Sequence, residues 1–249
     1  MPGDPVDAYL GMGSKATPEQ KQQIREELGL DKSLPEQYVI WVGNLAKGEL
    51  GTSTKFKLPV SEIIGDYVWN TFLLNLVSLV IGIGLSIPIG IKQATKKFSK
   101  FDNFWTVFSL LGVSVPTFFF ALILIFFVAL PSGVIPVNGM RTPDLAVFGY
   151  DNIFQEIGDV ALHMLLPTIV LAFGNFATFS RYVRSSMIDV INQDYVRTAR
   201  AKGLKEKTVI YRHAFKNALI PLVTLLGLYI PSLFSGAMIL DRIPVAWSG

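Results

Sequence analysis

VFSLLGVSVPTFFFALILIFFVAL, residues 107–130, contains no charged side chain. The hydrocarbon core of a bilayer is about 30 Å thick, and a helix needs about 20 apolar residues to cross it. A helix that is apolar on every side has no place on the surface of a small soluble domain. The stretch therefore predicts a helix that crosses a membrane.

The chain of 249 residues contains four runs of this kind. They predict membrane spans at about 71–91, 104–130, 162–180 and 218–240. Composition agrees, because only 16% of the residues are charged and 51% are hydrophobic, whereas a soluble domain carries about 25% charged residues. We therefore expect an all-α, polytopic membrane helix bundle. A soluble protein with buried core helices is the alternative, which this composition disfavours.

Basic residues orient the spans, because segments rich in Lys and Arg stay in the cytoplasm. Four lysines lie in 92–103, and nine Lys or Arg lie in 181–217. In 1–67 and 131–160 acidic residues outnumber basic ones. We therefore expect 92–103 and 181–217 to be cytoplasmic, and 1–67 and 131–160 to be external.

The expected external segment, 1–67, carries helix signals rather than a linker composition. Thr17 and Gln20 form a capping box, and Gly29 would end the helix that they open. Ser33 would open a second helix. We expect a small external helical segment that covers the bundle or contacts an external partner, with an apolar face formed by Tyr38, Trp41, Val42 and Leu45.

Small and polar residues take the place of charge within the predicted spans. Small residues at four-residue spacing let helices approach closely; they are Ser78, Gly82, Ser86 and Gly90. No Asp, Glu, Lys or Arg lies centrally in a span, which argues against a channel or an ion-coupled carrier. Four polar side chains would line a translocation path or, alternatively, hold helices together: Asn75, Ser114, Thr117 and Asn175.

The segment 181–217 has the pattern of a cationic helix–glycine–helix. Apolar residues recur at helical spacing from Ile188 to Ala199. Gly203 lies where the first helix needs a left-handed C-terminal cap. This pattern favours a docking element for a soluble partner, and a plain positively charged loop is the alternative.

The sequence offers no support for catalysis. The chain has no cysteine, and no zinc-protease, serine-hydrolase or nucleotide-binding motif occurs in it. His163 and His213 would lie on opposite sides of the membrane. We therefore expect no enzyme activity, no cofactor and no metal. A segment tethered between two spans is also poorly placed to bind nucleic acid.

Several stretches, in order along nearly the whole chain, carry a resemblance to a known family. DYVRTARAKGL at 194–204 and RHAFKNALIPLVTLLG at 212–227 are very similar to the cytoplasmic coupling segment of ABC transporter permeases. With PGDPVDA at 2–8 and HMLLPTIVLAFG at 163–174, they resemble the B-type permease subunits of oligopeptide, dipeptide and nickel importers. The family's usual Glu-Ala-Ala is replaced by Arg197-Thr198-Ala199, as in the peptide branch.

This resemblance implies a multi-pass permease of a bacterial-type inner membrane, with 68–249 as its transmembrane domain. The imported substrate would be an oligopeptide or dipeptide, with nickel or another small solute as the alternative. The implied partners are a second homologous permease subunit, two cytoplasmic ATPase subunits, an external substrate-binding protein and membrane lipid. The family has six spans, so we expect this chain to be a fragment that lacks the first and the last.

The resemblance also implies that a groove on the ATPase receives the coupling helix. Tyr195 and Val196 would supply apolar contact, and Arg197, Arg200 and Lys202 would meet acidic groups. Gly203 would allow the turn into the next helix. The implied coupling residues are Asp194, Tyr195, Val196, Arg197, Thr198, Ala199, Arg200, Ala201, Lys202, Gly203, Leu204 and His213.

Overall fold

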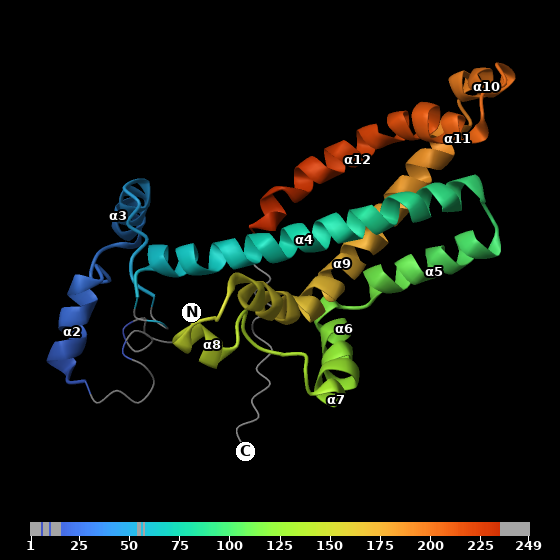
Figure 1. Cartoon of the computed structure of the whole chain (residues 1–249). Helices are drawn as coiled ribbons and strands as arrows, with labels where there is room; N and C mark the ends of the chain where they lie inside the picture. Colours follow the sequence, from blue (N-terminus) through green and yellow to red (C-terminus); the bar gives the residue numbers. More distant parts are fainter. Residues whose placement is uncertain (1–5, 7–9, 11–15, 54–55, 57, 235–249) are drawn as a thin grey trace. The chain divides into compact units, whose positions relative to one another are not determined.

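A computed structural model describes residues 6, 10, 16–53, 56 and 58–234 (Figure 1). The described part is helical and contains no strand, only an isolated bridge between Thr52 and Pro59. The all-α prediction is confirmed. The chain divides into two compact units, Met1–Trp69 and Asn70–Gly249.

In the first unit, two capped helices precede α4: α2 (Pro18–Glu27) and α3 (Leu34–Ala46). The predicted capping box is present at α2, since the Thr17 amide donates to Gln20 Oε1 at 3.0 Å. At α3 the Ser33 amide donates to Glu36 Oε2 at 3.0 Å. Gly29 has the expected positive φ of 66°. The predicted apolar residues of α3 are exposed: Tyr38, Trp41, Val42 and Leu45.

Two long helices, α4 (Val60–Thr95) and α9 (Ile153–Ile191), are long and apolar enough to cross a membrane. They contain the predicted spans 71–91 and 162–180. At 1.5 Å per residue each is more than about 50 Å long, which exceeds the thickness of the hydrocarbon core. Pro88 and Pro167 lie inside these helices without ending them.

The helix α9 also takes in residues that the sequence pattern assigned to loops. It begins after Asn152, whose side chain accepts a hydrogen bond from the Gln155 amide at 2.9 Å. It continues past Arg181 to Ile191. The expected single helix from Ile188 to Ala199 is therefore wrong, because the chain leaves α9 at Asn192 and a new helix starts two residues later.

The predicted span 104–130 is not one continuous helix. It consists of α5 (Lys100–Ser114), α6 (Thr117–Leu124), the π-helical turn Ile125–Ala129 and α7 (Leu130–Ser132). The two halves are bent by 103° at the break before α6, so the segment is a broken span or a re-entrant loop. Pro116 explains the break, because proline lacks an amide donor and keeps the preceding residue out of the helical region. Val115 is accordingly extended, with φ −80° and ψ 124°.

After α8 (Pro143–Phe148) and α9, the remaining helices form the coupling segment and the start of the fourth predicted span. They are α10 (Asp194–Ala201), α11 (Glu206–Thr208), the π-helical segment Val209–Phe215, α12 (Lys216–Tyr229) and a 3₁₀ turn at Pro231–Leu233. From Glu206 to Tyr229 these pieces follow one another without a break. The end of the predicted span, 235–240, lies outside the described residues.

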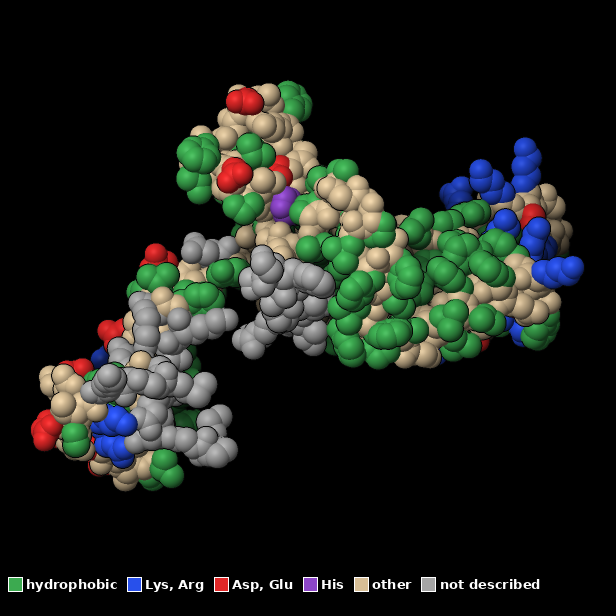
Figure 2. Space-filling model, turned by 90° about the horizontal axis from the view of Figure 1, so that it is seen from below, with side chains coloured by type: hydrophobic (Ala, Val, Ile, Leu, Met, Phe, Trp, Pro, Cys, Tyr) green, Lys and Arg blue, Asp and Glu red, His purple; other side chains and the backbone are tan. Residues whose placement is uncertain are grey.

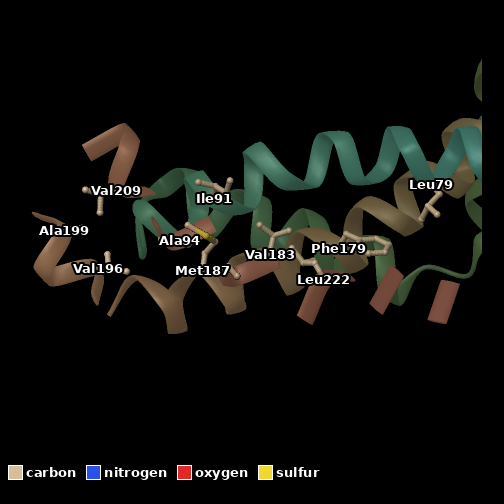
Figure 3. Close-up of a cluster of buried hydrophobic side chains, with 12 residues drawn as sticks. Leu79, Ile91, Ala94, Phe179, Val183, Met187, Val196, Ala199, Val209 and Leu222 are labelled. Atoms are coloured by element: carbon tan, nitrogen blue, oxygen red, sulfur yellow. The ribbon is translucent and has the colours of Figure 1, made fainter. Parts of the chain in front are cut away.

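Helix α9 is the centre of the second unit, where glycines let its neighbours approach. A Cβ at Gly82 or Gly90 of α4 would lie 2.6 Å from Asn175 or 2.7 Å from Val183. On α5, a Cβ at Gly112 would lie 2.6 Å from Ala177. These contacts confirm the predicted close packing at small residues. Figure 3 shows the apolar cluster that runs along this crossing.

We expect Gly90→Ala to lower the stability of the bundle by about 1–3 kcal/mol, because the added methyl group overlaps Val183. Gly84 is the matched control, since it lies in the same helix and a Cβ there meets nothing within 4 Å. Gly84→Ala should be neutral or stabilising by up to about 1 kcal/mol, since alanine favours helix over glycine. Thermal unfolding in detergent measures both. Equal unfolding midpoints for the two variants would contradict close packing at Gly90.

Candidate functional site

The helix α10 has one buried and one exposed face. Val196 is fully buried and Ala199 is 4% exposed. Figure 3 shows both residues near Val209, at one end of the apolar cluster. The opposite face is exposed and presents Asp194, Tyr195, Arg197, Thr198, Arg200 and Ala201.

The burial of Val196 corrects one expectation. The resemblance implied that Val196 would contact a partner, but its side chain packs inward against the protein's own core. The reason is its spacing, because Val196 and Ala199 are three residues apart and share one face of a helix. Tyr195 is 43% exposed and remains available as an apolar contact.

Gly203 makes the turn that the sequence predicts. Its φ is 72°, in the left-handed region that glycine adopts without steric cost. The amide of Gly203 donates to the carbonyl of Arg200 at 2.9 Å, and the amide of Lys202 donates to that of Thr198 at 3.1 Å. These bonds end α10, and Leu204 follows them with 41% of its surface exposed.

An ion pair closes the turn on its outer side. The Arg200 guanidinium lies 2.9 Å from Glu206 Oε1, so α10 and α11 are linked across Gly203. Hydrogen bonds from Arg200 hold the pKa of the Glu206 carboxyl below its usual value. The carboxylate therefore stays ionised at neutral pH. Arg200 was expected to meet a partner's acidic groups, but in this structure its charge is shared with Glu206.

Two other predicted coupling cations are more open. Arg197 is 70% exposed and lies 3.7 Å from Asp194, a long contact between exposed groups. Lys202 is exposed just before the turn. His213 lies apart from α10, half-buried in the π-helical segment, where its backbone carbonyl accepts a hydrogen bond from the Asn217 side chain at 2.9 Å.

Charge is distributed unevenly over the second unit. Lys and Arg side chains gather at one end of it, to the right in Figure 2, and the surface beside them is largely hydrophobic. The basic end holds α10, α11 and the turn between α4 and α5 (Figure 1). The exposed acidic residues Asp144 and Asp151 belong to the opposite part of this unit, around α8.

The four polar residues suggested for a translocation path do not form one group. The Asn75 side chain donates to the Leu233 carbonyl at 3.2 Å, which ties α4 to the turn after α12. Asn175 lies against Gly82 where α9 crosses α4. Ser114 and Thr117 are exposed on either side of the break at Pro116. Asn75 and Asn175 thus take part in helix contacts, and the path assignment stays a prediction.

A buried ion pair near the basic end was not predicted. Asp102 at the start of α5 is 1% exposed, and its Oδ1 lies 2.6 Å from Arg184 Nε on α9. Arg184 Nη2 donates to Asp102 Oδ2 at 2.8 Å, so the pair is bidentate. The Phe98 amide donates to the same carboxylate at 2.9 Å, and the Gln93 side chain lies 3.4 Å from the Asp102 carbonyl oxygen.

Sequence reasoning counted Arg184 among the cations of the coupling segment and Asp102 among the loop residues. One signal was present: Phe176, Ser180 and Arg184 are spaced four residues apart, on one face of α9. Phe176 and Ser180 are buried, and Ser180 Oγ lies 2.8 Å from Ser109 Oγ of α5. A cation on that face needs a buried carboxylate as its partner.

A second polar cluster holds the loop before α9 in place. Asp159 accepts hydrogen bonds from the Thr142 hydroxyl at 2.6 Å and from the Tyr150 hydroxyl at 2.8 Å. Loss of solvent and the bond to Asp159 raise the pKa of Tyr150, so its hydroxyl stays a donor. His163 Nδ1 lies 2.9 Å from the Asp159 carbonyl oxygen, so the histidine joins the same cluster.

Comparisons with known proteins agree with this picture. Residues 86–243 match the family described as binding-protein-dependent transport system inner membrane component, and residues 1–75 match the N-terminal family of the same systems. The chain is 41% identical over 249 residues to the oligopeptide transport system permease protein AppB of Bacillus subtilis (strain 168), covering 100% of this chain and 75% of that protein.

Two further relatives are similar over the whole chain. A putative peptide permease protein of Brucella suis biovar 1 is 38% identical, and 75% of it is covered. The dipeptide transport system permease protein DppB of Escherichia coli (strain K12) is 35% identical over 265 residues, and 77% of it is covered.

We expect Asp102→Asn to destabilise the second unit by about 3–5 kcal/mol, because it leaves the Arg184 charge without its buried partner. Arg181→Gln is the matched control on the same helix, since Arg181 is exposed, and should change stability by less than about 0.5 kcal/mol. The double variant Asp102→Asn/Arg184→Met should lose less stability than the single variants Asp102→Asn and Arg184→Met lose together. Additive losses in thermal unfolding would show that the two charges are not coupled.

Proposed function

Because the chain belongs to the family of binding-protein-dependent transport system inner membrane components, we propose that it is a permease subunit of an ATP-driven importer of oligopeptides or dipeptides. The names of the relatives support the substrate class, since they are an oligopeptide, a dipeptide and a putative peptide permease. These relatives give no support to the nickel alternative. The permease subunit itself carries out no catalysis in this proposal.

The placement in the membrane is supported by the separation of charges in the second unit. Its basic end would lie in the cytoplasm and the loop around α8 on the external side, as the excess of Lys and Arg in 92–103 and 181–217 predicts. The hydrophobic surface beside the basic end would face lipid (Figure 2). The two charges of the Asp102–Arg184 pair neutralise each other near that end, so this pair does not call for ion-coupled transport.

The exposed face of α10 is the proposed docking surface for a cytoplasmic ATPase subunit. The single observation that carries this proposal is the division of α10 into an inward apolar face and an outward cationic one. Tyr195 supplies an apolar contact at the surface, and Arg197 and Lys202 supply charge. A plain positively charged loop would need no inward anchor.

The inward face suggests how ATP hydrolysis would reach the membrane. Val196 and Ala199 belong to the same apolar cluster as Met187 of α9 and Leu222 of α12. A displacement of α10 would therefore move the adjacent ends of α9 and α12 with it, because closely packed side chains transmit the displacement to their neighbours. A pair of ATPase subunits would drive alternating access through this contact, with a second permease subunit completing the path and an external binding protein delivering the peptide.

We expect Arg197→Glu to reduce recovery of the ATPase subunits with the detergent-solubilised permease by about tenfold or more, since reversing a charge at a complementary interface costs several kcal/mol. Lys207→Glu is the matched control, because Lys207 is exposed in α11 and outside the docking face. It should leave recovery unchanged. Equal recovery with both variants and the parent chain would contradict docking through α10.

The Arg200–Glu206 pair allows a second test. Arg200 either contacts the ATPase subunit directly or stabilises the turn at Gly203 through Glu206. Arg200→Glu should impair ATPase recovery because it places two carboxylates across Gly203. The exchange Arg200→Glu/Glu206→Arg restores the pair with its polarity reversed and should recover most of the binding. If the exchanged variant binds no better than Arg200→Glu, Arg200 contacts the ATPase directly and the pair is not its main role.

A further inference from the structure

The turn between α4 and α5 presents an exposed aromatic ring in an unfavourable backbone conformation. Phe98 has a φ of 63°, the one positive value among the described residues other than glycine. A bulky side chain in this region is a rare outlier. The ring is nevertheless 76% exposed, so burial within the described part of the chain does not compensate for the strain. A strained backbone conformation at an exposed aromatic residue suggests that the residue makes a functional contact at the surface.

The turn is held in this conformation by the buried ion pair. The Phe98 amide donates to Asp102 Oδ2 at 2.9 Å, and Asp102 is itself fixed by Arg184. The Ser99 amide donates to the Lys96 carbonyl at 3.1 Å and closes the turn. The exposed ring is therefore presented by a rigid support rather than by a loose loop.

One lysine lies over the ring, and three more lie close to it in sequence. Lys97 Nζ lies 4.8 Å from the centre of the Phe98 ring, and Lys92 Nζ lies 4.3 Å from that of Phe101. All four lysines in this turn and at the adjoining ends of α4 and α5 are exposed, and within the described residues none of them forms an ion pair: Lys92, Lys96, Lys97 and Lys100. Asp102, the nearest carboxylate in sequence, is already neutralised by Arg184.

We infer that Phe98 and these lysines form a contact site for anionic phospholipid headgroups, with the ring inserted at the headgroup level. Charge complementarity supports lipid as the occupant, because the cytoplasmic leaflet is negatively charged and attracts lysines placed next to a membrane helix. An exposed aromatic ring among lysines suits the boundary between headgroups and acyl chains. The inference rests on the proposed membrane placement, in which the turn joins two helices at the cytoplasmic surface.

The chain has no cysteine, so Phe98→Cys carries a single thiol for an environment-sensitive bimane label. The full chain would be reconstituted in nanodiscs of phosphatidylcholine alone and of equal parts phosphatidylcholine and phosphatidylglycerol. Lys207→Cys is the control, exposed at the same end of the unit. The label at 98 should be quenched by lipids that carry a nitroxide at the headgroup and should be protected several-fold from aqueous iodide, more so with phosphatidylglycerol. The label at 207 should be open to iodide in both lipids.

Two outcomes would overturn the inference. In one, iodide quenches the labels at 98 and 207 equally in both lipids. In the other, protection at 98 occurs only after the ATPase subunits are added, which would make the site a protein contact. A wrong membrane orientation can be told apart from a wrong lipid site with sealed inside-out vesicles. If the orientation is wrong, added iodide will not quench the label at 207 in these vesicles.

Selectivity for the headgroup charge gives a second measurement. Spin-labelled phosphatidylglycerol should associate with the parent chain more strongly than spin-labelled phosphatidylcholine. The preference should fall by about fivefold for each lysine removed in Lys96→Gln and Lys97→Gln. Phe98→Gly keeps the turn conformation accessible and removes only the ring, so it should weaken association of both lipids. An unchanged phosphatidylglycerol preference in the lysine variants, matching that of Lys207→Gln, would refute the site.

Discussion

The buried pair of Asp102 and Arg184 is the interaction on which the basic end of this protein depends. A carboxylate removed from water is tolerated only when it is paired with good geometry, and here Arg184 pairs with it in a bidentate way at 2.6 and 2.8 Å. It joins the start of α5 to α9, and the same carboxylate fixes the turn that follows α4 through the Phe98 amide. One carboxylate thus sets the relative position of three helices where they reach the proposed cytoplasmic surface.

Apolar packing carries this fixed arrangement onward to the proposed docking helix. Val196 and Ala199 join the cluster that contains Met187 of α9 and Val209 of the next helix. The apolar face of α10 is buried in this cluster, so its outer face presents charged residues, small residues and Tyr195. The separation of the two faces makes α10 part of the bundle on one side and a partner surface on the other.

Local signals in the sequence were sufficient for the features that one helix decides by itself. The capping residues of α2 and α3, the left-handed turn at Gly203 and the apolar lengths of α4 and α9 follow from short-range chemistry. Proline chemistry accounts for the bend at Pro116 once it is seen but does not predict it, because Pro88 and Pro167 remain inside helices.

Contacts between distant residues were also beyond single-sequence reasoning. The partner of Arg184 lies on another helix, so the sequence neighbours of Arg184 suggest a free loop cation rather than a half-buried, paired one. The family resemblance implied a partner contact for Val196, but Val196 shares the inward face of α10 with Ala199. Both errors concern which side of a helix is covered, which depends on the packing of other helices.

The central claim is that α10 moves with the bundle as one body when the ATPase subunits close. Spin labels at Lys207→Cys on α11, which the Arg200–Glu206 pair links to α10 outside the docking face, and at Tyr182→Cys on α9 are the direct test, since both side chains are exposed and the chain has no other cysteine. Their distance distribution would be measured by pulsed electron resonance in the assembled importer, with and without ATP. If α9, α10 and α11 form one rigid body, the distribution is the same in both states. A distance that shifts or broadens on ATP binding would show that α10 and α11 move independently of α9, which contradicts rigid coupling.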